Sequence, residues 1–347
     1  MATANAQQIK LGYGDYSVGL VCALPKELTA ATAMLDEIHE DLPRSSTDTN
    51  VYTLGSIGPH NIAMACLPKN RIGNVSAATV ATNLINRFPA VKFVLMVGIG
   101  GGIPSKVRLG DVVVSSPIGK FPGVVQWDIG KAKEGGDFER IGVLNPPPNL
   151  LLNTLSKLET RHELGKSQIS KYLEEMVQKY PALEAEYLKS ESLKDELFQS
   201  GYQHVEPEET DKDSDDEEEE DEESEETGCQ YCDRSKIVKR KPRGMKVHYG
   251  LIASGNVVVK DALLRKKLNK DLDGNVLCIE MEAAGIMFNL PCLVIRGICD
   301  YADSHKNDHW QKHAAAVAAA FAKEFLTSLQ AEEVKGEKSA QEVIARG

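Results

Sequence analysis

Short apolar runs alternate along the chain with longer segments in which apolar residues recur at helical spacing. This alternation is typical of an α/β fold built on a central sheet. Gly58-Pro59-His60 separates two of the runs and predicts a hairpin. The pattern predicts strands at 16–24, 51–57, 61–67, 91–103, 111–115, 247–255 and 292–298, and helices at 26–38, 74–87, 260–269 and 309–330.

The helix expected at 74–87 illustrates how a buried face is predicted. Asn74 is suited to the N-cap, because its side chain can accept a hydrogen bond from a free backbone N–H. Helical spacing places Val75, Ala78, Thr82 and Ile85 on one face. We expect this face to contact the sheet.

The pattern changes between about residues 150 and 245. A charged helical stretch is followed by 206–226, which holds 16 acidic residues and one lysine. Such a segment cannot bury enough apolar surface to offset the entropy of ordering it. We therefore expect one catalytic α/β domain over 14–330, an insertion at 150–245 with a disordered acidic segment at 206–226, and a flexible tail at 331–347.

Charge and composition exclude several classes of protein. The net charge is −11, but the acidic segment alone carries −15, so the rest of the chain is slightly positive at +4. This excludes a strongly basic nucleic-acid-binding protein. The N-terminal residues lack the pattern of a secretory signal, and no apolar run reaches membrane-spanning length. Seven cysteines, mostly in apolar runs, indicate a reducing compartment. We expect a cytoplasmic protein without membrane or nucleic-acid partners.

Three separated segments place carboxylates where predicted strands end or helices begin. They are ALPKE with Glu27, IEMEAAG with Glu280 and Glu282 on either side of Met281, and RGICDYAD with Asp300. A ligand crevice tends to form where strands of a parallel-rich sheet end. The alternative for each acid is a helix cap that satisfies backbone donors. A carboxyl group held in the interior after the strand at 292–298 would resist ionisation and could donate a proton.

Together with VGIGGG at 97–102, these motifs resemble the purine and uridine phosphorylase superfamily. The resemblance is strongest to its 5′-methylthioadenosine/S-adenosylhomocysteine nucleosidase branch and to fungal nucleosidase-like domains, and it covers 14–130 and 246–328. It implies a nucleoside phosphorylase-type three-layer α/β fold with a mixed twisted central sheet flanked by helices. It also implies a homo-oligomer, a dimer or larger, that works without metal or cofactor.

The resemblance implies roles for the acidic residues. Glu282 would accept hydrogen bonds from the ribose hydroxyls with help from Glu280, and Met281 would pack against the sugar. Asp300 would protonate the purine at N7, and Glu27 would orient the attacking water. These residue types suit cleavage of an N-glycosidic bond, which develops positive charge on the sugar.

The resemblance also implies contacts to the sugar and the base. Gly100 and Gly101 would let the backbone approach the sugar, because no Cβ intervenes. Val258 and Val259 would contact the base. Val258 stands where the nucleosidases stack an aromatic ring, and valine cannot stack.

The sequence favours water over phosphate as the nucleophile. Phosphorylases hold a phosphate dianion with arginine and hydroxyl groups. Here CALPKE carries no arginine, and Ile99 occupies the position of a phosphate-binding serine. We therefore expect hydrolysis of a purine nucleoside or nucleotide derivative to free base and pentose. Phosphorolysis through an atypical site and a catalytically silent nucleoside-binding module remain the alternatives.

Two further features have competing interpretations. Lys69 and Arg71 align with the pocket for the 5′ substituent, where they could bind a 5′-phosphate, although solvated surface charges are the favoured interpretation.

The pair Cys229 and Cys232 has His204 and His248 as possible metal-binding partners. A structural zinc site needs four ligands, so unpaired thiols or a local clip are favoured over zinc. His305 and His309 are interpreted as surface histidines at a helix start.

Overall fold

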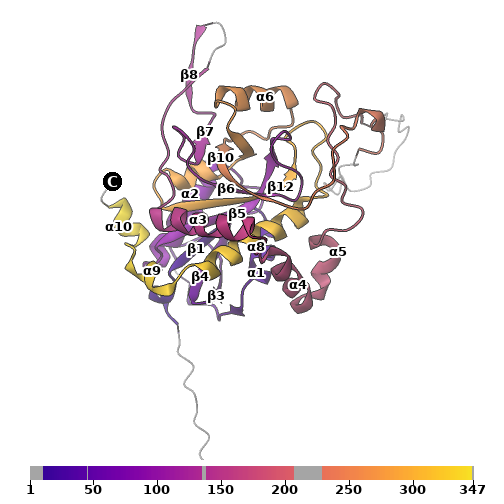
Figure 1. Ribbon diagram of the computed structural model, residues 1–347. Coiled ribbons are helices and arrows are strands. Elements are labelled where there is room, and N and C mark those ends of the chain that lie inside the picture. Colours follow the sequence, from indigo (N-terminus) through magenta and orange to yellow (C-terminus); the bar gives the residue numbers. More distant parts are fainter. Residues whose placement is uncertain (1–10, 45, 135–137, 207–228, 346–347) are drawn as a thin grey trace, which may run out of the picture.

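The computed structural model describes residues 11–44, 46–134, 138–206 and 229–345. A mixed sheet crosses the molecule in the order β11-β10-β6-β12-β5-β1-β4-β3-β2, and β7 pairs with β10 (Figure 1). A separate small sheet pairs β8 with β9. The strands are β1 (Val18–Cys22), β2 (Glu37–Ile38), β3 (Tyr52–Ile57), β4 (His60–Cys66), β5 (Phe93–Gly102), β6 (Val112–Ser115), β7 (Val124–Gln126), β8 (Gly130–Ala132), β9 (Phe138–Arg140), β10 (Val247–Ser254), β11 (Val276–Glu280) and β12 (Cys292–Asp300).

The long central strand β5 positions the site. It runs parallel to β1 and β12, and its last residues Gly101 and Gly102 also pair with β11. The sheet therefore curls at this end, because β11 pairs with both β10 and β5. The ends of β1, β5, β11 and β12 meet at this curled edge.

Helices cover both faces of the sheet. On one face α1 and α8 pack with α3, α4 and α5, and on the other α2 packs with α7 and α10. Side chains of successive strand residues alternate between the two layers, so Leu20 joins the first core and Val21 the second. The helices are α1 (Pro25–Ala33), α2 (Asn74–Arg87), α3 (Asn149–Glu163), α4 (Ile169–Lys179), α5 (Glu184–Tyr187), α6 (Ala262–Asp271), α7 (Ala283–Met287), α8 (Gln311–Ser328), α9 (Ala331–Gly336) and α10 (Ala340–Ile344). The predicted three-layer α/β class is confirmed.

Helix α2 covers the predicted residues but buries a different face. Val75 is 81% exposed, and the buried residues include Ala77, Val80, Ala81, Leu84 and Ile85. Of the predicted face only Ile85 is buried. Apolar residues recur at helical spacing on two faces of this helix, and spacing alone does not show which face packs against the sheet. The N-cap is Gly73 at φ +97°, and Asn74 is the first helical residue. Its Oδ1 accepts hydrogen bonds from Ser254 and Gly285 instead.

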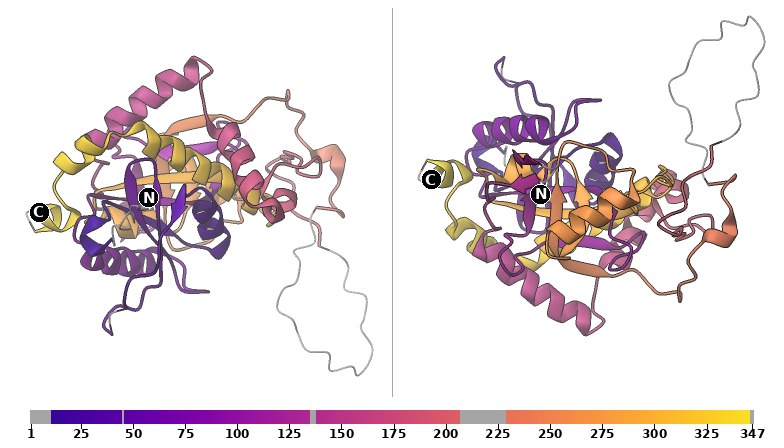
Figure 2. Two further views of the ribbon diagram at one scale, coloured as in Figure 1. Left: turned by 90° about the horizontal axis from the view of Figure 1, so that it is seen from below. Right: turned by 90° about the horizontal axis from the view of Figure 1, so that it is seen from above.

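The region expected as an insertion has two unlike halves. Helices α3, α4 and α5 bury apolar side chains against α8 and belong to the main core. Between residues 188 and 246 the described chain is mostly irregular and lies at the opposite end of the molecule from α9 and α10 (Figure 2). The acidic segment predicted at 206–226 lies, except for Glu206, outside the described residues.

The C-terminal tail differs from the expectation. Instead of fraying, it forms α9 and α10, whose Val334 and Ala340 are buried. The backbone N–H of Ala340 donates to the Val91 carbonyl at 2.8 Å. The tail is held because its few apolar residues reach both cores. Among the described residues, none of the helices has the length and apolarity needed to span a membrane.

Candidate active site

One cavity of about 200 Å³ opens at the curled edge of the sheet. All of the residues that the sequence assigned to the site line this cavity: Glu27, Gly100, Gly101, Val258, Val259, Glu280, Met281, Glu282 and Asp300. They come from α1, β5, the segment after β10, the β11–α7 junction and β12. The fold therefore brings together segments that are more than 270 residues apart in the sequence.

Glu27 forms part of the start of helix α1. Its Oε2 accepts hydrogen bonds from the backbone N–H groups of Ala23 and Leu24 at 2.7 and 2.9 Å. Its Oε1 accepts one from Ile99 N at 2.8 Å. The capping role that was the alternative for this acid is therefore present. Each carboxylate oxygen can accept two hydrogen bonds, so Oε1 keeps one position free.

Burial raises the pKa of Glu27, although Arg296 and three backbone N–H groups oppose the shift. Arg296 is fully buried and is the centre of what we call the Arg296 cluster, which also contains Glu27, Glu280 and Glu282. Its guanidinium forms an ion pair with Glu280 and lies 3.4 Å from Glu282 Oε2. Arg296 therefore forms a structural ion pair and also orients a carboxylate of the cavity wall.

Glu280 and Glu282 are neighbours with different surroundings. The carboxylate of Glu280 accepts from the backbone N–H groups of Glu282 and Ala283, both at 3.0 Å, and from Arg296. Its Oε2 is filled by these donors at the start of α7, and its Oε1 accepts only from Ala283 N at 3.3 Å. Glu282 has two long contacts, from Gly73 N and Arg296, both at 3.4 Å. Its lone pairs are therefore the ones available to hydroxyl groups in the cavity.

The environment of Glu282 also changes its protonation. Burial raises its pKa to about 7, the charge of Arg296 opposes this shift, and the charges of Glu280 and Glu27 add to it. Three carboxylates share one guanidinium, so the cluster cannot hold all of its acids ionised at low energetic cost.

Asp300 ends strand β12 at the cavity wall. Its Oδ1 accepts from Ala302 N at 2.7 Å, and its Oδ2 lies 3.2 Å from both the Cys299 thiol and the Lys306 ammonium. Although burial opposes the shift, the charge of Asp300 raises the pKa of Lys306. From the sequence we expected Asp300 to be a neutral acid in the interior. The structure adds the Lys306 ammonium beside it.

The two cavity glycines are required by their neighbours. A Cβ at Gly101 would lie 2.7 Å from Asp300 Oδ1, and one at Gly100 would lie 2.5 Å from Cys278 Sγ. Both glycines let β5 pack tightly against β11 and β12 while forming the floor of the cavity. This close packing is a second reason, besides access to a ligand, for glycine at these positions.

Sequence reasoning missed several residues of the cavity. Lys306 and Gln311 line it, and so do Ile72 and Ile279. Lys306 had a signal, since it follows Asp300 by six residues in DYADSHK. Lys69 and Arg71 are exposed and are not among the lining residues, whereas Ile72 from the same loop is. Val258 is 43% exposed at the rim.

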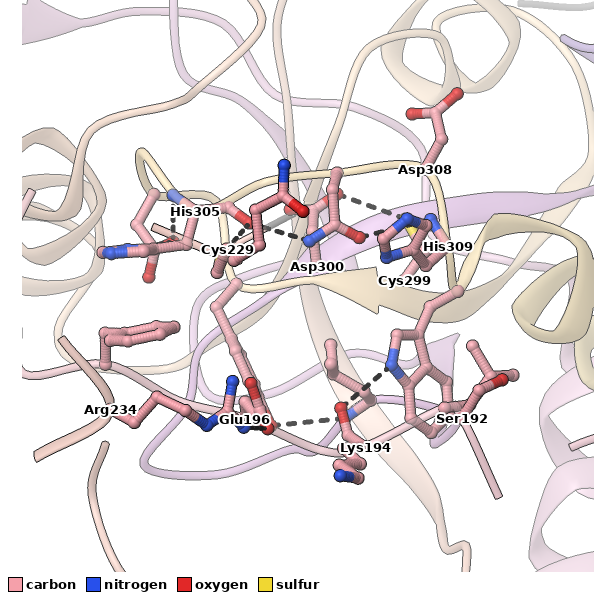
Figure 3. Close-up of a pocket in the computed structure, with 18 residues that line it drawn as sticks. Ser192, Lys194, Glu196, Cys229, Arg234, Cys299, Asp300, His305, Asp308 and His309 are labelled. Carbon is pink, nitrogen blue, oxygen red and sulfur yellow. Dashed lines mark hydrogen bonds and ion pairs between the residues drawn. The ribbon is translucent and has the colours of Figure 1, made fainter. Parts of the chain in front are cut away.

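A larger cavity of about 940 Å³ adjoins the first one and shares Cys299 and Asp300 with it (Figure 3). Its wall comes from the irregular segments around 192–198 and 229–234 and from the loop 301–310 that follows β12. This loop carries Lys306 and His305. The irregular half of the insertion therefore reaches the back of Asp300.

Comparisons with known proteins agree with this architecture. The family model described as the phosphorylase superfamily matches residues 17–329. A nucleotide-binding leucine-rich repeat (NLR)-like protein from Hyaloscypha variabilis is 43% identical over 92% of this chain and 30% of its own length. The ATP nucleosidase Cap17 from Escherichia coli is 26% identical over 89% of this chain and 51% of its own length. The chain thus spans from under a third to about half of these two curated relatives.

Solved structures show the same fold. The 5′-methylthioadenosine/S-adenosylhomocysteine nucleosidase of Helicobacter pylori, in complex with a pyrrolopyrimidine compound, superposes with a TM-score of 0.55 at 18% identity over 91% of this chain and all of that one. The futalosine hydrolase of the same organism superposes equally well at 19% identity, over 91% of this chain and 99% of that one. The family that the motifs indicated is therefore confirmed, and the chain belongs to the phosphorylase superfamily.

Proposed function

We propose that this chain hydrolyses the N-glycosidic bond of a purine nucleoside or nucleotide derivative, releasing free base and pentose. The observation that carries the proposal is that Glu27, Glu282 and Asp300 line one cavity with glycine on its floor. The distant nucleosidase relatives support the same chemistry.

In the proposed reaction water attacks the anomeric carbon of the sugar. The free lone pair of Glu27 Oε1 orients this water and takes its proton. The bond between the anomeric carbon and the purine nitrogen breaks, and its electrons remain on the base, which receives a proton at N7 from Asp300. Glu282 in its carboxylate form accepts hydrogen bonds from the ribose hydroxyls and stabilises positive charge on the sugar.

The site is better suited to water than to phosphate. Ile99 N, which lies between Gly98 and Gly100 of β5, already donates to Glu27 Oε1. A phosphate dianion here would face the carboxylate of Glu27, and the Arg296 guanidinium is already shared among three carboxylates. Phosphorolysis and silent binding are the outcomes that an assay must separate from hydrolysis.

The deciding assay offers adenosine, inosine, AMP and ATP to the chain in phosphate-free buffer and separates the products by chromatography. We expect free base and free pentose, with no gain in rate on adding phosphate. Strict phosphate dependence with pentose 1-phosphate as product would establish phosphorolysis. Saturable binding without turnover would establish a binding module.

The same panel tests the 5′ substituent. If the substrate carries a 5′-phosphate, Arg71→Ala should lower kcat/KM for AMP and ATP by about 10-fold, as loss of one charged hydrogen bond does, and leave adenosine unchanged. Lys157→Ala, on the exposed face of α3, is the matched control for removal of one surface cation. An Arg71→Ala chain that cleaves AMP and ATP as fast as the parent would end the nucleotide hypothesis for this loop.

Oligomeric state stays a prediction from the resemblance. We expect a dimer or larger assembly, which mass photometry of the purified chain would measure.

A further inference from the structure

A group of metal-binding side chains lies in the irregular half of the insertion, away from the cavity floor. The ligand atoms of His204, Cys229 and Cys232 all lie within 4.8 Å of one another. Cys232 Sγ lies 3.3 Å from His204 Nδ1. His248, the other histidine that the sequence offered, binds Asp111 and takes no part.

The 3.3 Å between Cys232 Sγ and His204 Nδ1 fits the coordination geometry of zinc. Bond lengths of about 2.3 Å to sulfur and about 2.0 Å to nitrogen put tetrahedral ligand atoms roughly 3.5 Å apart. The two cysteines belong to a tight turn, in which Cys232 N donates to the Cys229 carbonyl at 3.4 Å. A Cys-x-x-Cys turn can therefore bind one ion through both sulfurs.

We propose that His204, Cys229 and Cys232 bind one zinc ion and that His305 supplies the fourth ligand. The side chain of His305 is only 7% exposed, contrary to the surface position expected from the sequence. Within the described part of the chain, its buried Nε2 has no hydrogen-bond partner. Its ring lies 5.8 Å from that of His204 at an interplanar angle of 89°.

The surroundings of His305 suit a metal ligand. Its Nδ1 lies 3.7 Å from the Asp303 carboxylate, which also pairs with Arg265 at 2.9 Å. An acid behind the non-ligating nitrogen is the usual arrangement for a zinc-binding histidine, because it orients the ring. Phe198 stacks on His305 with ring centroids 4.1 Å apart. Cys229 and His305 lie on the same wall of the large cavity (Figure 3).

The ion would fasten the insertion to the active-site side of the domain. His204 and Cys229 stand on either side of 205–228, and His204 N already donates to Ser304 Oγ at 3.0 Å. A metal that joins these points to the loop after Asp300 would hold the outer wall of the large cavity in place. Such a clip stabilises most when it closes a long loop.

The test measures zinc in the full chain purified under reducing conditions. We expect one zinc per chain by elemental analysis and by native mass spectrometry. Replacement by Co²⁺ should give the thiolate charge-transfer and visible bands of a tetrahedral site. Less than 0.1 zinc per chain after incubation with excess zinc, or a Cys229–Cys232 disulfide in the zinc-treated chain, would overturn the proposal.

Variants identify the ligands. Cys229→Ser/Cys232→Ser should lose zinc, and His305→Gln should bind it at least 10-fold more weakly in chelator competition. Cys66→Ser, a half-buried cysteine of β4 outside the group, should bind zinc like the parent. The parent stoichiometry decides the main point even if a variant fails to fold, and parent-like affinity in a folded His305→Gln chain would refute the role of His305.

Discussion

Two buried charged clusters of this molecule contain acids in opposite situations. In the first, the Asp111 carboxylate accepts from Arg243, His248 and the backbone N–H groups of Arg108 and Lys246. Burial alone would raise its pKa, but these donors outweigh burial and lower the pKa to about 2. In the second, the Arg296 cluster, three carboxylates share one guanidinium, and the pKa of Glu282 is raised to about 7.

The difference separates a structural acid from an acid that is available for chemistry. Every lone pair of Asp111 has a donor from the protein, so the group is a fixed connection between β6, β10 and the end of the insertion. Glu282 has only weak partners and faces a cavity. The pKa values of both groups are strongly shifted, so the shift alone does not distinguish them. The unfilled hydrogen-bond capacity of Glu282 does.

The largest expected effect lies at the cavity. Asp300→Asn keeps an oxygen for Ala302 N but removes the acid, so turnover should fall by about 10²–10⁴. Release of free base, followed by chromatography, measures the loss. The thermal midpoint of Asp300→Asn should fall modestly, because Lys306 loses its charged partner but is a quarter exposed. Full turnover in this variant would show that Asp300 is not the acid.

The next largest effect is a loss of stability, expected at Asp111. Asp111→Asn leaves Arg243 and His248 facing a neutral group, which should cost about 3 kcal/mol of unfolding free energy in urea titrations. The kcat of the folded chain should not change.

The pH dependence of this loss has a definite sign. Because the pKa of Asp111 is lower in the folded than in the unfolded chain, its contribution is complete above pH ~4 and disappears as the pH falls through about 2. The gap between parent and Asp111→Asn should therefore close in acid. A gap that is the same at pH 3 and pH 7 would contradict this assignment.

The smallest effect is expected for Glu282→Gln. Loss of the charged acceptor for ribose hydroxyls should lower kcat/KM by about 10–100-fold at pH 8. Because the carboxylate forms as the pH passes about 7, kcat/KM of the parent should rise with pH up to that value. The kcat/KM of Glu282→Gln should not show this rise. If kcat/KM of the parent did not change between pH 5.5 and 8, ionisation of Glu282 would not be required for the reaction.

The contribution of Glu282 to the free energy of unfolding should change with pH in the opposite direction from that of Asp111. The folded chain keeps a proton on Glu282 at pH values where the unfolded chain has released it, between about 4.5 and 7. Its contribution to stability therefore decreases as the pH rises through this window. Glu282→Gln should gain stability relative to the parent over the same range.

Much of the fold and of the site could be predicted from the sequence. The apolar runs marked most strands of the main sheet, and β11 was missed because Val276–Glu280 is short and joins directly to a helix start. Every site residue that the resemblance implied lines the cavity. The predicted buried face of α2 was wrong except for Ile85, because apolar residues recur at helical spacing on two faces of this helix.

What the sequence determined by itself is local. Apolar periodicity sets which segments become strands, and motif spacing sets which acids stand at strand ends. Tertiary structure decided which of these acids has its hydrogen-bond positions occupied by protein donors and which faces the cavity. It also turned His305 inward and supplied Lys306 to Asp300. Protonation depends on neighbours within a few ångströms, and those neighbours come from parts of the chain that only folding brings together.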